Sequence, residues 1–250
     1  MKTFLSHVAQ DLTARFGGNL HDVTIVFPGK RASLFLTQEL TETGISPLWE
    51  PEYISMDSLF GEFTALEQAN PIESICTLLR LMQEIIPEER DQSLDTLWGW
   101  GEVILSDFDD IDKHMADARL VLANVYDQHC LEHLDYLTPE QEEALRKFFS
   151  NFSDDHNSEL KKRFLQLWCH FYDIYVEFNK RLAQQGLAYE GALYRNVANN
   201  ENIAFRHKKY LFVGFNMMQK VELNLCDRLM KQGKAAFYWD FDKYYMKDGN

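Results

Sequence analysis

Two short runs of strand-type residues, far apart in the sequence, constrain the fold of this chain most. VTIVF at 23–27 is β-branched and apolar apart from one threonine, and YLFVGF at 210–215 is of the same kind. Apolar runs of this length are typical of strands buried on both faces, as in a parallel sheet covered by helices. Each run is followed by a turn and then by helical spacing of apolar residues. Both therefore predict a strand, turn and helix unit.

The pattern around and between these runs predicts the domain organisation. Helices are expected at 2–16, 30–40, 158–185, 189–198 and 218–231, and further strands at 53–55 and 235–241. The glycine pair at 17 and 18 is expected to end the first of these helices. From about residue 71 onward, helical spacing continues for over a hundred residues without an obvious strand. We therefore predict an α/β fold in which residues 1–67 and 188–250 build one parallel sheet and residues 68–187 form an all-helical inserted subdomain. Because a small parallel sheet has exposed edges, the chain is expected to be the front piece of a longer protein.

Composition and charge exclude several classes of protein. The chain is 46% hydrophobic and 26% charged, which is globular composition, and no stretch approaches the roughly 18 apolar residues of a membrane-spanning helix. Its four cysteines form no CxxC pair, so neither a zinc knuckle nor a dense disulfide framework is expected. The net charge is −14, divided as −20 over residues 1–160 and +6 over residues 161–250. We expect a cytoplasmic protein without membrane contact, in which any polyanion meets the last third.

The turn after the first strand run does not match a nucleotide site. VFPGKRAS has one glycine and lacks the GxxxxGK[ST] pattern whose successive amides wrap phosphates. The second run is followed by Asn216, where a metal-binding acid would be required for ATP hydrolysis. No cofactor is therefore expected. Lys30 and Arg31 nevertheless stand at a predicted helix start beyond the end of a strand, where open sheets place ligands, so an anion site competes there with an ordinary turn.

Other polar clusters give weaker predictions. Asp107, Asp109, Asp110 and Asp112 lack the spacing of a calcium loop and are more typical of a solvated helix end, or of a docking face. His129 and His133 share a helix face but no metal-binding motif, so no metal site is expected. No nucleophile motif is present, and we predict no catalytic residues.

The last third combines basic and aromatic residues, which single-stranded nucleic acid requires. Most of its aromatic residues, however, recur at helical spacing, which is more typical of the apolar face that a helix packs against the core. The basic residues concerned are 161–163, Lys180, Arg181, Arg195, Arg206, Lys208 and Lys209.

Several strings resemble one family over nearly the whole chain. They are IVFPGKRASLFLTQEL, PLWEPEYISMDSLF, WGEVILSDFDDID, LAYEGALYRNV and LFVGFNMMQKVE. Together they resemble the amino-terminal region of Bacteroidetes AddB-like proteins, long chains with an inactivated superfamily I helicase half and a distant PD-(D/E)XK nuclease. The resemblance implies a RecA-like parallel sheet of the helicase 1A type, interrupted by a helical insertion.

The resemblance also implies a function and a site. Pro28, Lys30, Arg31 and Ser33 would contact the backbone of a DNA strand, in a non-catalytic scaffold of a repair and recombination exonuclease with an AddA-like partner subunit. The DNA would be single-stranded or a duplex end. The alternative is a protein-interaction module that docks its partner through the acidic helical subdomain. A small-molecule enzyme, with a deep polar pocket in the crevice of the sheet, is a third alternative.

Overall fold

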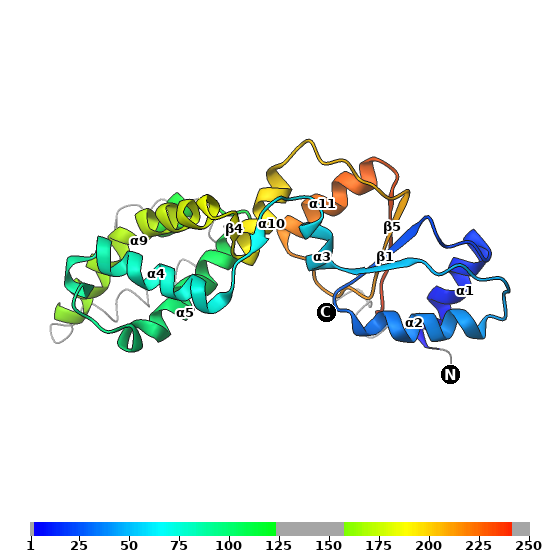
Figure 1. Ribbon diagram of the computed structural model, residues 1–250, viewed down its shortest axis with the longest axis horizontal. Coiled ribbons are helices and arrows are strands. Elements are labelled where there is room, and N and C mark those ends of the chain that lie inside the picture. Colours follow the sequence, from blue (N-terminus) through cyan, green and yellow to red (C-terminus); the bar gives the residue numbers. More distant parts are fainter. Residues whose placement is uncertain (1–2, 124–157, 242–250) are drawn as a thin grey trace, which may run out of the picture. The chain divides into compact units, whose positions relative to one another are not determined.

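The structure is a computed structural model that describes residues 3–123 and 158–241, with side chains described from residue 170 in the second range (Figure 1). It contains two compact units. The sheet unit is built from residues 1–65 and 193–250, and the central unit from residues 66–192. The sequence places these boundaries at 67/68 and 187/188.

The sheet unit contains four parallel strands and the helices between them. Its elements are α1 (Phe4–Phe16), β1 (Val23–Phe27), α2 (Arg31–Glu42), β2 (Glu52–Ser55), α3 (Met56–Gly61), β5 (Lys209–Val213), α11 (Lys220–Lys231) and β6 (Ala235–Tyr238). Helix α10 (Glu190–Asn199) starts in the central unit and continues into the sheet unit. The strand order is β2-β1-β5-β6, and every neighbouring pair is parallel. An α/β fold with a parallel sheet is therefore confirmed, although β6 is shorter than the 235–241 run predicted.

Helices cover both faces of this sheet. All five residues of β1 are buried, as its apolar sequence predicts. Alternate residues of β1 and β5 join α1 and α2 in one core cluster, whose members include Val8, Leu12, Ile25, Phe27, Leu36, Leu40, Leu211 and Val213. The intervening residues point to the other face, because side chains alternate along a strand. Helix α11 lies against β6 and buries Val221, Leu225 and Leu229 there (Figure 1).

Local signals explain where the first helix begins and ends. Thr3 is the N-cap of α1, and its hydroxyl accepts a hydrogen bond from the amide of Ser6 at 3.0 Å. Gly17 ends the helix with φ of 64°, and its N–H donates to the carbonyl of Thr13 at 2.9 Å. A positive φ is accessible to glycine without strain from a Cβ atom, so the predicted stop is confirmed at this residue.

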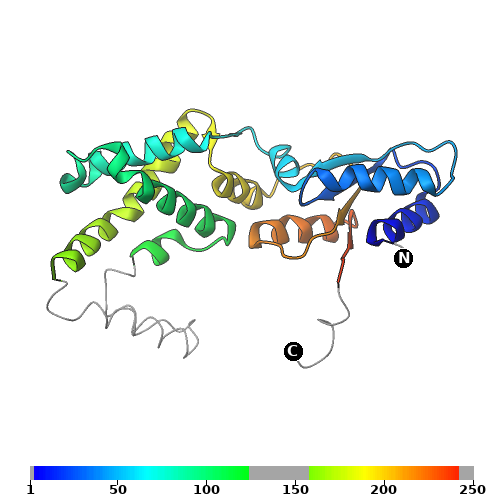
Figure 2. The same cartoon turned by 90° about the horizontal axis from the view of Figure 1, so that it is seen from below.

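The central unit is mainly helical. Its elements are β3 (Glu67–Gln68), α4 (Pro71–Ile85), the 3₁₀ turn η1 (Pro87–Glu89), α5 (Leu94–Lys113), α6 (Ala118–Ala123), α9 (Ser158–Gln184) and β4 (Leu187–Ala188). Helix α4 lies against α5 and α9 around one apolar core (Figures 1 and 2). The predicted all-helical character is wrong in one respect, because β3 and β4 pair in parallel as a two-stranded sheet. Two-residue strands carry too little pattern to be visible in the sequence.

The acidic run near the end of α5 is only in part the solvated helix end that its composition predicts. Asp107 and Asp110 are exposed, but the other two carboxylates are not. Asp112 is 1% exposed and accepts hydrogen bonds from the hydroxyls of Tyr175, at 2.6 Å, and Tyr189. The Asp109 carboxylate accepts a hydrogen bond from the amide of Gly191 at 2.6 Å and forms an ion pair with Lys113 at 2.7 Å. These two carboxylates therefore hold neighbouring elements of the central unit together. No cation site is needed to explain them.

Candidate nucleic-acid interface

The carboxyl ends of β1 and β5 form the edge of the sheet where the topology changes direction. From β1 the chain continues outward to β2, and from β5 it continues outward to β6. The connections that leave these two central strands therefore run in opposite directions along the sheet. Helices α2 and α11, which follow β1 and β5, both begin at this edge. In open α/β sheets the crevice at such a switch point is the usual position for a ligand.

A pocket of about 500 Å³ lies at this edge. Its lining residues are Thr3, Phe4, Leu5, Phe27, Pro28, Gly29, Ala32, Val213, Gly214 and Asp240. The lining is largely apolar and carries one carboxylate, Asp240, which repels phosphate. The pocket itself is thus poorly suited to a nucleotide, although Lys30 and Arg31 lie in the sequence between two of its lining residues, Gly29 and Ala32.

Of the four predicted contact residues, three are open to a ligand. Pro28 lines the pocket, Lys30 is the N-cap of α2 and Arg31 is its first residue, and all three are exposed. Ser33 instead donates its hydroxyl proton to the carbonyl of Lys30 at 2.7 Å. Its oxygen can then only accept, so Ser33 is not arranged to bind a phosphate oxygen. The structure therefore supports the position of Pro28, Lys30 and Arg31 more than that of Ser33.

Lys220, which the sequence did not single out, joins this group. It is the first residue of α11 and is exposed. Within the described part of the sheet unit, Lys30, Arg31 and Lys220 are the Lys and Arg residues whose side chains have no ion pair or hydrogen bond. The cations that do have partners are Arg15, Arg195, Arg206, Lys208, Lys209, Arg228, Lys231 and Lys234.

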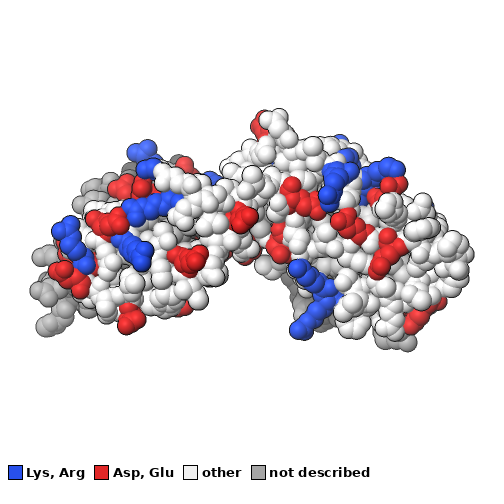
Figure 3. All heavy atoms as spheres, viewed as in Figure 1, with Lys and Arg blue, Asp and Glu red and all other residues white. Residues whose placement is uncertain are grey.

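Lys30 and Arg31 oppose the helix on which they stand, whereas Lys220 shares the first turn of α11 with Glu222, whose carboxylate accepts a hydrogen bond from the amide of Gln219 at 2.6 Å. The amino end of a helix carries partial positive charge, so a cation in the first turn costs about 0.3–1 kcal/mol of helix stability. Helix α2 has no acidic residue in its first turn and no side-chain cap to offset this cost. A bound anion would turn this cost into a favourable contribution, because the helix start and the basic side chains would both attract the anion. Figure 3 shows Lys and Arg atoms gathered beside the start of α2, while elsewhere on this face of the sheet unit basic and acidic atoms lie side by side.

Exposed apolar side chains accompany the cations. Phe35 is 61% exposed and stands four residues after Arg31, so both side chains share one face of α2. Trp239 follows β6 at the same edge, is 45% exposed and stacks on Phe237 with ring centroids 5.7 Å apart. A cation beside an open aromatic face is the combination that binds a phosphate and an adjacent unpaired base.

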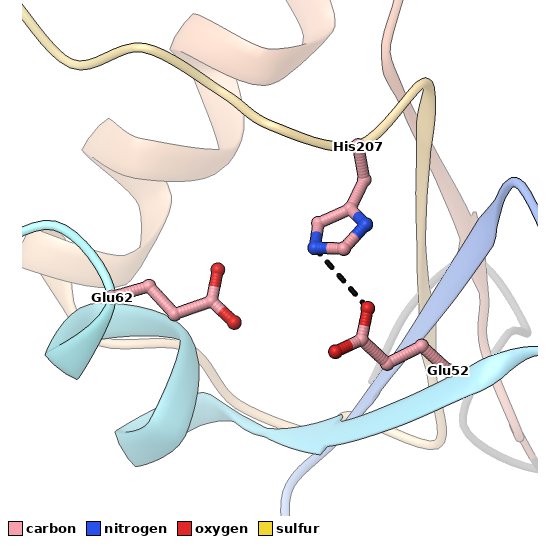
Figure 4. Close-up of side chains that lie close together, drawn as sticks. All are labelled: Glu52, Glu62 and His207. Atoms are coloured by element: carbon pink, nitrogen blue, oxygen red, sulfur yellow. Dashed lines mark ion pairs between the residues drawn. The ribbon is translucent and has the colours of Figure 1, made fainter.

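A second group of functional side chains lies at the opposite, amino edge of the sheet. Glu52, Glu62 and His207 each place a donor atom within 4.8 Å of the others. Figure 4 shows the three side chains converging on one space. Sequence reasoning missed this group because its members are far apart in the chain. The pair it did consider for metal, His129 and His133, lies outside the described residues, as do the side chains of residues 161–163.

Comparisons with models of known protein families and with curated proteins give no match. The AddB-like resemblance therefore stays a prediction carried by the sequence strings alone. In the described part of the chain, no helix combines the length and the apolar character needed to cross a bilayer.

Proposed function

We propose that this chain is a non-catalytic scaffold that holds a DNA strand at the carboxyl edge of its parallel sheet. One observation carries the proposal: Lys30, Arg31 and Lys220 are cations without partners among the described residues, and all three begin helices at the topological switch point. Other described cations of the sheet unit are already engaged. The unfavourable position of Lys30 and Arg31 at the start of α2 is explained by a bound anion, to which Lys220 would add a contact from α11.

A polyanion explains this arrangement better than a nucleotide does. The cations stand on two separate helices, the pocket at this edge of the sheet carries Asp240, and the turn after β1 has one glycine instead of a phosphate loop. Asn216 follows β5 where an ATPase would need a carboxylate for its metal. The scaffold is therefore expected to hold phosphates without hydrolysing ATP. Phe35 and Trp239 favour a strand whose bases are unpaired.

The finer assignment rests on the sequence resemblance together with the fold. The parallel four-stranded sheet is compatible with a RecA-like helicase core, and the helical central unit lies in sequence between its two parts. We accordingly place the chain as the inactivated helicase-like front of an AddB-like repair nuclease, working with an AddA-like subunit. The nuclease motif would belong to another part of such a protein.

The salt dependence of DNA binding tests this function. Each phosphate contact adds about 0.7 to the slope of log K against log salt for single-stranded DNA, through release of counterions. Replacing Lys30, Arg31 and Lys220 together by alanine is therefore expected to lower the slope by about 2 and to weaken binding uniformly across sequences. Fluorescence anisotropy with labelled single- and double-stranded oligonucleotides at several salt concentrations measures both quantities. Adding ATP with Mg²⁺ should leave the affinity unchanged.

A matched control separates the site from net charge. The Lys208→Ala, Lys231→Ala double variant removes two exposed cations that pair with Asp22 and Asp227, so it should keep nearly the wild-type slope, unlike the Lys30→Ala, Arg31→Ala double variant. If the two double variants lose affinity equally, the binding is not located at the start of α2. A wild-type slope near zero would remove the DNA proposal altogether.

One observation favours the protein-docking alternative. On α5, Trp100 is 50% exposed and Val103 is 53% exposed, and their spacing places them on one face of the helix. An exposed tryptophan beside an aliphatic residue, on a helix that also carries an acidic run, suits a protein partner more than a nucleic acid. This surface belongs to the central unit, so it can coexist with DNA binding at the sheet edge. It becomes the principal function if the DNA titrations show no binding.

A further inference from the structure

The amino edge of the sheet brings together one imidazole and two carboxylates from three separate elements. Glu52 is the first residue of β2, Glu62 follows the last residue of α3, and His207 lies two residues before β5. Glu52 is fixed by its pairing with Thr24 of β1. The backbone of His207 is held through its amide, which donates to the hydroxyl of Tyr210 at 3.3 Å. The three side chains therefore start from ordered backbone.

The distances between the donor atoms fit a single ion. The three atoms lie within 4.8 Å of one another, and Nε2 of His207 is 3.2 Å from Oε2 of Glu52 (Figure 4). Two ligands about 2.1 Å from a tetrahedral ion are roughly 3.4 Å apart, and two on opposite sides are about 4.2 Å apart. The group thus needs only small rotations of the two exposed glutamate side chains to close around one cation beside the partly buried imidazole of His207.

An internal cation already occupies this position. The guanidinium of Arg206 places Nη2 at 3.3 Å from Oε1 of Glu62 and 3.7 Å from Oε1 of Glu52. Its Nε donates to Nε2 of His207 at 3.1 Å. The same imidazole nitrogen also faces the Glu52 carboxylate, so its lone pair and the carboxylate oxygens are directed to one centre of positive charge. Because the Arg206 side chain is 66% exposed, it can leave this centre for water without a large rearrangement.

We propose that Glu52, Glu62 and His207 form a binding site for Zn²⁺, from which the metal displaces the guanidinium of Arg206. One imidazole with two carboxylates is a nitrogen and oxygen donor set that suits Zn²⁺ and leaves room for water as a further ligand. A bound ion would link β2, the end of α3 and the segment before β5. This site is at the opposite edge of the sheet from the DNA interface and does not depend on it.

Isothermal titration of the metal-free, reduced 250-residue chain with Zn²⁺ tests the site. His207→Asn and Glu62→Gln are each expected to weaken binding at least roughly tenfold, since removal of a direct ligand should cost no less than removal of its supporting partners. Arg206→Ala is expected to strengthen binding by about tenfold, because it removes the competing cation. His21→Asn, a change of an exposed histidine outside the group, serves as the matched control and should bind as the wild type does.

Each outcome decides one part of the proposal. If His207→Asn and Glu62→Gln both bind Zn²⁺ with wild-type affinity, any binding belongs to other histidines or cysteines and the site is wrong. If the two variants lose binding but Arg206→Ala gains none, Zn²⁺ does not displace the guanidinium. Circular dichroism of the metal-free variants verifies that each of these surface substitutions leaves the chain folded.

Discussion

Replacing Asp112 by alanine is expected to destabilise the central unit by about 3 kcal/mol. The Asp112 carboxylate is buried and accepts the hydroxyl protons of Tyr175 and Tyr189. Without it, both phenols lose this acceptor, the Tyr189 hydroxyl does so in a buried position, and a small cavity is added. Burial, with Asp112 as a further cause, raises the pKa of Tyr189 well above its usual value, so this phenol stays protonated and keeps needing an acceptor.

Urea-induced unfolding followed by circular dichroism measures this loss. Asp110→Ala is the matched control, because Asp110 is on the same helix, carries the same charge and is exposed. The transition midpoint of Asp112→Ala should fall well below that of Asp110→Ala. Equal midpoints would mean that the two tyrosines do not depend on the carboxylate. Asp112→Asn should lie between, since an amide oxygen still accepts one of the two hydrogen bonds.

Replacing Gly18 by alanine is the second change with a large expected effect, a loss of about 3 kcal/mol from the sheet unit. A Cβ atom on Gly18 would lie 2.2 Å from the backbone oxygen of Pro47 and 3.2 Å from Cγ2 of Ile45. The backbone is also held from that side, because the amide of Trp49 donates to the carbonyl of Gly18 at 2.7 Å. The two chain segments must therefore separate to admit one methyl group, and this breaks their pairing.

Gly61→Ala provides the control for this prediction. Gly61 ends α3 in the same unit, a Cβ atom there would meet no atom within 4 Å, and its φ is not positive. Alanine should therefore be neutral or slightly stabilising at this position. Thermal unfolding of the two variants compares them directly, and a Gly18→Ala midpoint as high as that of Gly61→Ala would contradict the close approach to Pro47.

The sequence predicts elements well where a single local pattern decides them. The five residues of β1 match the predicted strand because they form one uninterrupted apolar run between turn residues. Gly17 ends α1 as predicted, since a positive φ is a local requirement. Gly18 was predicted to serve the same stop, but its role is contact with Pro47, a neighbour that no local pattern reveals.

In the candidate site, too, the sequence reveals the residues of one continuous segment but not their neighbours from distant segments. Lys30 and Arg31 could be found because they follow a strand and open a helix in one continuous segment. Lys220 could not, because its place at the same edge of the sheet depends on the pairing of β1 with β5, whose residues are far apart in the chain. In the acidic run on α5, the solvated position was predicted wrongly for Asp109 and Asp112, for a related reason. Asp112 and Asp109 accept hydrogen bonds from groups within residues 175–191, which composition alone does not place beside them.

Hydrogen exchange of the backbone amides, with and without a saturating single-stranded oligonucleotide, tests the central claim most directly. Bound phosphates would accept hydrogen bonds at the starts of α2 and α11, so exchange should slow in residues 30–34 and 219–223 and stay unchanged in α5. The Lys30→Ala, Arg31→Ala, Lys220→Ala variant should lose this protection. Protection that appears on α5 around Trp100 and Val103, or nowhere in the chain, would contradict a DNA strand held at the carboxyl edge of the sheet.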